Sequence, residues 1–190
     1  MRTTKKETWK VFKFGGSSLA DTACFVRVSK IILDSYIASE EQPHSIVVSA
    51  MGGFTDLLIK ISKDISAESL KSSSEYKSII DRISIISNDL LDSAESEKYL
   101  QEVSEDFIEI KKILDQSNNN KDALRKGKGD IIAGYGELWS ARLLNIYLNK
   151  LLASNKSNFI DSRQVLFLKE SDTGDSIAVS YTHLTLPTKA

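Results

Sequence analysis

The stretch VFKFGGSSLADTACFVRVSKII, residues 11–32, decides the fold of this chain. It opens on an alternating apolar segment, residues 9–14, which is typical of a strand. It closes on a helical pattern with Asp21 as the predicted N-cap. The apolar residues on one face of that helix are Phe25, Val28 and Ile32. The order predicts a strand that turns into a helix through a double glycine.

Lys13 stands two residues before that double glycine, Gly15 and Gly16, where an anion site would need a cation. Glycines let the backbone approach a ligand closely, and the start of a helix attracts negative charge. Ser17 and Ser18 add hydroxyl donors. The order differs from a Walker A loop, in which the lysine follows the last glycine, and from GxGxxG. The local pattern leaves two interpretations open: a phosphate site, or a tight turn with a solvated lysine.

A second strand and glycine turn follow the first. Residues 45–50, SIVVSA, predict a buried strand, and MGGFT leads from it into another helix. Strand, helix, strand and helix in this order predict an α/β fold with a parallel sheet covered by helices. Ligands bind such sheets at the carboxyl ends of the strands. Ser49 and Thr55 flank the second glycine pair there, so we expect their hydroxyls to meet in one crevice.

Residues 66–118 have a different character, rich in serine and acidic side chains but with apolar positions at helical spacing. We predict two antiparallel helices that form a helical insertion beside the sheet, with their apolar stripes as core. The first stripe is Ile79, Ile83, Ile86 and Leu90, and the second is Leu100, Val103, Phe107, Ile110 and Leu114.

A further helix is predicted to begin in residues 131–137, IIAGYGE, with short strands at 159–161 and 165–168 after it. Glu137 would then lie near a helix N-terminus, where the helix dipole favours a carboxylate. Two interpretations remain open for this residue. It is either a first-turn acid that stabilises the helix, or a carboxylate that captures a substrate ammonium group.

Composition narrows the function classes. The chain has 190 residues and a net charge of −1, so no basic field is available for nucleic acid or an anionic membrane. Cys24 is the single cysteine, which excludes an internal disulfide, and we predict it to be a small core residue. His44 and His183 have no partners at metal-ligand spacing, so no metal site is predicted. The first ten residues lack the apolar core of a secretory signal. These properties favour a soluble, intracellular protein.

Four segments in this order resemble motifs of the aspartate kinases in the amino-acid kinase family. The sequences of these segments are most similar to those of plant-type enzymes in which the kinase is fused to homoserine dehydrogenase. The segments are KFGGSS (13–18), VVSAMGGFTD (47–56), GYGELWSARLL (134–144) and FIDSRQVL (159–166). The resemblance implies a three-layer α/β sandwich with a mostly parallel sheet. It also implies phosphorylation of the β-carboxylate of L-aspartate with ATP and Mg²⁺, the first step of lysine, threonine and methionine synthesis.

The resemblance also implies roles for single residues. Lys13 would be catalytic, holding the transferring phosphoryl group and neutralising its charge. Ser49 would line the crevice shared by nucleotide and substrate, with Thr55 nearer the aspartate. Glu137 would pair with the aspartate ammonium group. The residues that would bind the nucleotide together with Lys13 and Ser49 are Phe14, Gly15, Gly16 and Ser17.

The chain departs from the family pattern in three places. Ser17 replaces the commoner threonine, which keeps the hydroxyl. Tyr135 stands where histidine is frequent, which is expected to alter the pocket wall. The later glycine-rich phosphate loop, the T-D-V-D-G segment and the regulatory ACT domains do not occur, and residues 179–190 match nothing in the family. We therefore predict that residues 1–178 are the N-terminal portion of an aspartate kinase domain, followed by a non-native tail.

This interpretation carries further expectations. The 190-residue chain alone is predicted to be inactive, and the full-length enzyme is expected to be a homo-oligomer. Its compartment would be the cytoplasm, or the plastid if a transit peptide lies outside the chain. The alternatives are another amino-acid kinase of the same fold and a non-catalytic module that binds aspartate.

Overall fold

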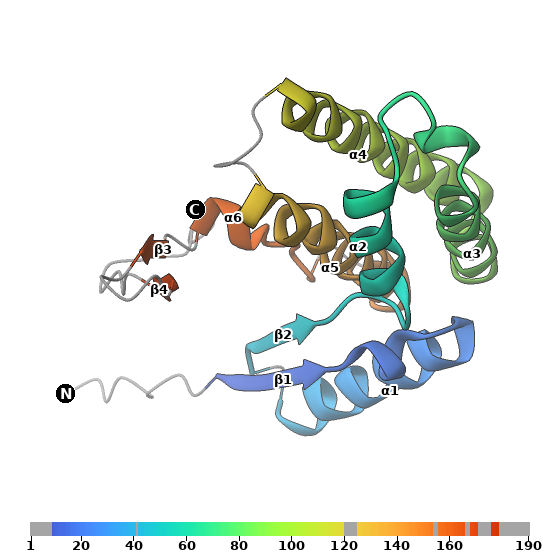
Figure 1. Ribbon diagram of the computed structural model, residues 1–190. Helices are drawn as coiled ribbons and strands as arrows, with labels where there is room; N and C mark the ends of the chain where they lie inside the picture. The colour runs from blue at the N-terminus through green and yellow to red at the C-terminus, as the bar shows by residue number, and fades with distance from the viewer. Residues whose placement is uncertain are drawn as a thin grey trace. The chain divides into compact units, whose positions relative to one another are not determined.

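The computed structural model describes residues 9–40, 42–119, 125–153, 156–165, 168–170 and 176–178. The chain divides into two compact units, Met1–Ser157 and Asn158–Ala190, which are described separately. The first unit contains β1 (Lys10–Phe14), η1 (Gly16–Leu19), α1 (Thr22–Ala38), β2 (His44–Val48), α2 (Phe54–Asp64), η2 (Leu70–Ser72), α3 (Ser74–Leu90), α4 (Ser93–Asn119) and α5 (Arg125–Leu151) (Figure 1). The second contains α6 (Ser162–Val165), β3 (Leu168–Glu170) and β4 (Ser176–Ala178). Among the described residues, none of the helices combines the length and apolarity needed to cross a bilayer.

The sheet of the first unit consists of β1 and β2, which run parallel (Figure 1). Lys10 pairs with His44 at one end and Phe14 with Val48 at the other. The pairing extends into the turn, because the Ser49 N–H donates to the Phe14 carbonyl at 3.0 Å. The predicted α/β class with parallel strands is therefore confirmed.

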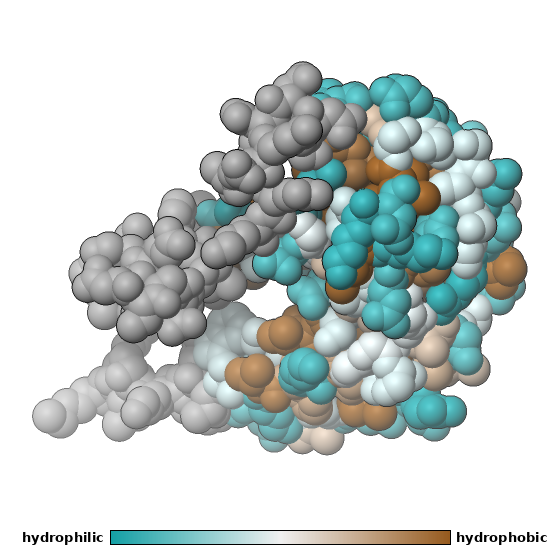
Figure 2. All heavy atoms as spheres, viewed as in Figure 1, coloured by the Kyte–Doolittle hydropathy of each residue, from teal (hydrophilic) through white to brown (hydrophobic). Residues whose placement is uncertain are grey.

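Helix α1 covers one face of this sheet. Phe12 of β1 stacks on His44 of β2, with ring centroids 5.4 Å apart, and Tyr36 of α1 contacts the same His44 ring edge-on. The opposite face carries Val11 and Val47, which are 70% and 50% exposed, and Figure 2 shows apolar surface in this region. The prediction that residues 45–50 form a fully buried strand was wrong, because the described helices leave this face open.

Helix α1 begins as predicted. The Asp21 carboxylate accepts a hydrogen bond from the Cys24 N–H at 2.8 Å and so caps the helix. The predicted apolar face is also confirmed, with Phe25, Val28 and Ile32 buried. Cys24 is not a core residue: it is half-buried, and its thiol donates to the Ser17 carbonyl at 3.6 Å.

The two predicted helices of the insertion are α3 and α4. They are joined by Leu91 and Asp92, and the hydroxyls of Ser87 and Ser96 hydrogen-bond between them at 2.8 Å. The predicted stripes are buried, except for the half-buried Leu100. Helix α4 ends at Asn119, one residue past the predicted insertion of residues 66–118, and residues 120–124 lie outside the described residues.

Helix α5 begins at Arg125 and not in the 131–137 segment, so the predicted start was wrong. Glycines at 127, 129, 134 and 136 cost about 1 kcal/mol each in an isolated helix, so the local sequence does not indicate a start as early as Arg125. Packing against α2 outweighs that cost. A Cβ at Gly136 would lie 3.2 Å from Leu58 of α2, so the glycine permits the close approach of the two helices.

The second unit differs from the sequence prediction in the positions of its strands. No strand forms at the described residues 159–161, and Val165 ends the short helix α6, so neither predicted strand has the expected bounds. Asp161 accepts from the Arg163 N–H at 2.9 Å at the start of α6. Strands β3 and β4 pair antiparallel, with Leu168 opposite Ala178. The expected tail at 179–190, with His183, lies outside the described residues.

The cap of α1 predicts a pH dependence of stability. The hydrogen bond from the Cys24 N–H lowers the pKa of Asp21 below its ordinary value of 3.8. Its contribution is therefore complete above the unfolded-state pKa and is lost as the pH falls through the lower native pKa. We expect Asp21→Asn, which keeps an acceptor but does not titrate, to weaken the fall in the free energy of unfolding below about pH 4.

Urea unfolding measured across this pH range checks the expectation. Asp34→Asn is the control, because Asp34 is an exposed aspartate within the same helix and caps neither end. It should keep the wild-type pH dependence. Identical pH dependence in the wild type and Asp21→Asn would contradict the assignment.

Candidate active site

Three segments of the first unit meet at Ala50, the residue after Ser49. A Cβ at Gly16 would lie 2.8 Å from the Ala50 carbonyl oxygen, so the first glycine turn touches the end of the second strand. A Cβ at Gly136 would lie 2.8 Å from the Ala50 Cβ, so α5 approaches from another side. The three motifs that are separate in the sequence therefore come into contact at Ala50.

The first turn places Lys13 at the end of β1 and closes through η1. The Ser18 N–H donates to the Gly15 carbonyl at 3.0 Å, and Gly15 itself is extended, with φ −79° and ψ 171°. A Cβ at Gly15 would meet no atom within 4 Å. Lys13 and Ser17 are exposed, and Lys13 forms neither an ion pair nor a hydrogen bond within the described part of the chain. Within the described residues, the turn thus places an unpaired ammonium group beside open backbone.

Phe14 occupies a different environment from its neighbours in this turn. Its ring stacks on Phe12 at a centroid distance of 6.2 Å, and its carbonyl accepts from Ser49. Both the ring and the carbonyl of Phe14 therefore make contacts within the sheet. These contacts hold the end of β1, from which the glycine turn starts.

The second turn needs a glycine at one position. Gly53 has φ 81°, in the left-handed region, and it precedes the first residue of α2. The Phe54 N–H donates to the Met51 carbonyl at 2.9 Å and closes the turn. Ser49 is half-buried and Thr55 is exposed in the first turn of α2. Neither hydroxyl hydrogen-bonds to another group among the described residues.

Glu137 lies near the middle of α5, not near its N-terminus, so the dipole argument made from the sequence was wrong. Its side chain is exposed and has no partner within the described ranges. It follows Gly136, which touches Ala50, while Tyr135 is buried beside Trp139 with ring centroids 6.2 Å apart. A carboxylate in mid-helix gains nothing from the dipole. The helix-stabilising interpretation of Glu137 is therefore removed.

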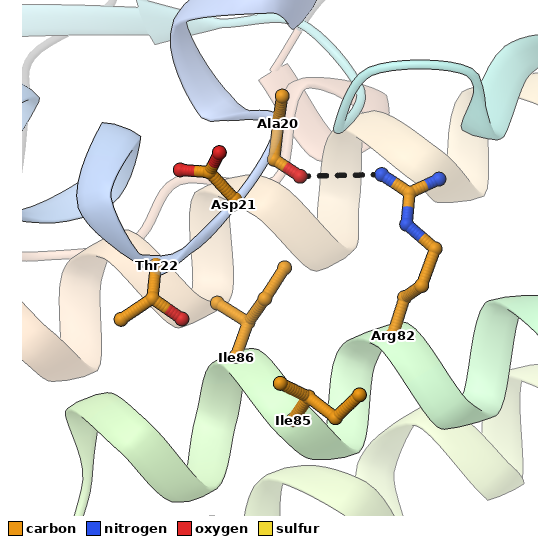
Figure 3. A pocket seen from close by; sticks show the side chains of 6 residues that line it. All are labelled: Ala20, Asp21, Thr22, Arg82, Ile85 and Ile86. Atoms are coloured by element: carbon orange, nitrogen blue, oxygen red, sulfur yellow. Dashed lines mark hydrogen bonds between the residues drawn. The ribbon is translucent and has the colours of Figure 1, made fainter.

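Sequence reasoning missed Arg82 of α3. One of its terminal nitrogens, Nη2, donates to the Gly52 carbonyl at 2.8 Å and to the Ala20 carbonyl at 3.2 Å. The second of these bonds is drawn in Figure 3. The available signal was spacing, because position 82 lies three residues after Ile79 and four before Ile86. A cation on the core-facing side of a helix indicates a buried acceptor.

The described side chains of this region carry charges of both signs. Among the described residues, no group of three or more His, Cys, Asp and Glu side chains is placed to hold a metal ion. Lys13 supplies a full positive charge beside the open backbone at Gly15, and Glu137 supplies a carboxylate on a neighbouring segment. The three segments therefore carry groups for a phosphate and for an ammonium group.

Known proteins resemble this chain in sequence and in fold. The model of the amino acid kinase family matches residues 8–179. The chain is 25% identical over 169 residues to the chloroplastic bifunctional aspartokinase/homoserine dehydrogenase 2 of Arabidopsis thaliana, covering 89% of this chain and 18% of that protein. It is 30% identical over 158 residues to bifunctional aspartokinase/homoserine dehydrogenase 2 of Escherichia coli (strain K12), covering 83% and 18%. The chain thus spans less than a fifth of these relatives.

Two solved structures share the fold. E. coli aspartokinase III in complex with aspartate and ADP superposes with a TM-score of 0.61 at 22% identity, covering 76% of this chain and 29% of that one. The same enzyme in complex with lysine and aspartate gives a TM-score of 0.57 at 20% identity, covering 78% and 30%. At this identity the likeness establishes the fold. The resemblance drawn from the four motifs is confirmed at the level of the family.

The contact between Gly136 and Ala50 predicts opposite effects for two neighbouring substitutions. Gly136→Ala forces its Cβ into Ala50 and should destabilise the fold by about 1–3 kcal/mol. Gly134→Ala is the matched control, because a Cβ there meets nothing within 4 Å and alanine is the better helix former. It should stabilise the fold by about 0.5–1 kcal/mol. Denaturant unfolding of both variants measures the difference, and equal effects would refute the packing.

Proposed function

The chain belongs to the amino acid kinase family, and we propose that it is the N-terminal portion of an aspartate kinase catalytic domain. The reaction is the transfer of the γ-phosphoryl group of ATP to the β-carboxylate of L-aspartate, which gives β-aspartyl phosphate and ADP. In a cell this step would begin lysine, threonine and methionine synthesis. The names of the relatives, and the aspartate and ADP bound to one solved structure, support this choice of substrates.

The observation that carries the proposal is the open environment of Gly15. Its φ of −79° is accessible to any residue, and no atom lies within 4 Å of where its Cβ would be. Neither the turn nor the packing of the described residues therefore requires a glycine there. A ligand that approaches the backbone closely does require one, and phosphate groups bind to backbone N–H groups in this way. We assign Gly15, Gly16 and Ser17 to the nucleotide phosphates.

Lys13 is the catalytic residue of the proposal. Phosphoryl transfer needs positioning and charge neutralisation more than covalent chemistry from the protein. The ammonium group of Lys13, at the end of β1, has no partner among the described residues, so it can neutralise the charge that develops on the transferring group. Mg²⁺ would arrive with ATP, since this metal is held largely by substrate phosphates.

The aspartate end is assigned to the other two segments. Glu137 would accept hydrogen bonds from the substrate ammonium group, and Thr55 would lie beside the substrate in the first turn of α2. Ser49 would line the crevice between nucleotide and aspartate. The support is the contact of Gly136 with Ala50, because it joins the segment that carries Glu137 to the residue after Ser49.

The activity belongs to a longer protein in this proposal, since the chain spans less than a fifth of its bifunctional relatives. We propose a homo-oligomer in the cytoplasm, or in the plastid as for the chloroplastic relatives. Sequencing the gene across the codons for residues 172–190 tests whether the chain is part of a longer kinase. A frame that continues into a glycine-rich phosphate loop would support it. A stop codon after residue 190 would favour the alternative, a non-catalytic module that binds aspartate.

Two substitutions in the full-length protein test the site. Lys13→Ala should lower kcat by about 100-fold or more, because a charge that acts on the transition state is lost. Glu137→Gln should raise the KM for aspartate by about tenfold or more with a smaller effect on kcat. Trapping the acyl phosphate with hydroxylamine in the presence of ATP and L-aspartate measures both constants.

The matched control is Lys30→Ala, which removes an exposed lysine of α1 distant in sequence from the three motifs. It should behave as the wild type. An unchanged kcat in Lys13→Ala would contradict the catalytic role assigned to that lysine. Binding of aspartate without any hydroxamate from the wild type would select the non-catalytic alternative.

Gly15→Ala separates ligand binding from folding. Because the structure leaves space for the Cβ, the thermal unfolding midpoint should stay within about 2 °C of the wild type. The KM for ATP should rise by about tenfold, because the methyl group obstructs the phosphates. A wild-type KM for ATP in this variant would show that no phosphate approaches Gly15.

A further inference from the structure

We propose that Arg82 is a positioning residue of this site, which holds the two glycine turns in one register through their backbone carbonyls. The inference rests on the proposed function and adds a residue outside the four motifs. Because Arg82 lies on α3, the proposal also gives the helical insertion a role in positioning the site.

The geometry of Arg82 carries the proposal. Its Nη2 donates to Ala20, which ends η1, and to Gly52, which precedes the left-handed Gly53 at the start of α2. One nitrogen atom thus joins the two turns that follow β1 and β2. Figure 3 shows the guanidinium reaching from α3 toward the start of α1, at the rim of a pocket between these helices.

The guanidinium is fixed from further directions. Its central carbon lies 4.6 Å from the centroid of the Phe54 ring, and a Cβ at Gly53 would lie 3.8 Å from Nη1. Arg82 is half-buried and pairs with no carboxylate in the described part of the chain. Its charge is therefore committed to the two carbonyls and the ring. A surface arginine with a solvated head would show none of these contacts.

The glycine turns need such an external tie. Paired glycines have more conformational freedom than any other dipeptide. The turns touch each other through small groups: a Cβ at Gly52 would lie 3.2 Å from the Ala20 Cβ and 3.4 Å from the Gly16 carbonyl oxygen, and a Cβ at Gly16 would lie 2.8 Å from the Ala50 carbonyl oxygen. Arg82 bonds to Gly52 beside these contacts. A second tie from α3 holds the start of α1, because the Thr22 hydroxyl donates to Asp89 at 2.8 Å. Helix α3 therefore holds the end of the first glycine turn, which would bind the nucleotide, at Ala20 and the start of α1 at Thr22.

A consequence for catalysis follows from in-line transfer. The nucleotide turn would hold the phosphoryl donor and the second turn would help to hold the acceptor, so their relative position sets the attack geometry. A misplacement of about 1 Å can cost on the order of 100-fold in rate. Losing Arg82 should therefore lower kcat more than it raises either KM.

Hydrogen exchange on the 190-residue chain tests the tie without any need for activity. Arg82→Met should raise amide exchange by about tenfold in residues 15–20 and 50–55. The matched control is Lys60→Met, which breaks the other cationic contact between α2 and α3, the 2.5 Å pair with Glu75, and touches neither turn. Unchanged exchange in Arg82→Met, or an equal rise in Lys60→Met, would overturn the proposal.

Kinetics of the full-length enzyme test the consequence. Arg82→Met should lower kcat by about 10- to 100-fold with smaller changes in KM, and Arg82→Lys should recover part of the loss. If the methionine variant does not fold, the lysine variant decides, and wild-type kcat there would contradict the proposal. Absence of phosphorylation in the wild type would refute the proposed function. The exchange experiment would still decide whether Arg82 holds the turns.

Discussion

The contact of Ala50 with two glycines is the constraint on which the rest of the first unit depends. Its carbonyl faces Gly16 and its methyl group faces Gly136, each at a distance that leaves no room for a side chain. The end of β2, the first glycine turn and α5 therefore lie close against one another. The position of helix α2 depends on the same contact, because Phe54 and Leu58 of α2 pack against Gly136 beside Ala50. Close packing at these two glycines, more than any ion pair, defines where the candidate site lies.

The sequence was sufficient where structure depends on neighbours along the chain. The strand, glycine turn and capped helix at the N-terminus, and the apolar stripes of α3 and α4, follow from local periodicity and capping chemistry. The start of α5 could not be predicted in this way, because its glycines oppose helix formation locally and gain from packing against α2 only in the folded state. Arg82 was missed for a similar reason, since its acceptors are carbonyls of segments far away in the sequence.

The helical insertion supports the candidate site on both sides. Helix α3 contacts the glycine turns through Arg82, while α4 contacts α5 close to Glu137. Trp139 donates its indole N–H to Asp106 at 2.9 Å, and Arg142 pairs with the same carboxylate. Burial raises the pKa of Tyr99, so its hydroxyl stays protonated and donates to the Trp139 carbonyl at 2.9 Å. The rotation of α5 about its axis is therefore fixed by polar contacts, two residues away from Glu137.

The open face of the parallel strand pair has a consequence for the chain in isolation. Val11 and Val47 lie on that face, and within the described residues each strand pairs on one side only. Unpaired N–H and C=O groups beside exposed valines form a template onto which another extended chain can add. Such a surface favours self-association of partly folded molecules at high concentration, as during overexpression. Soluble yield would then be determined by this strand pair more than by the well-packed helices around Trp139.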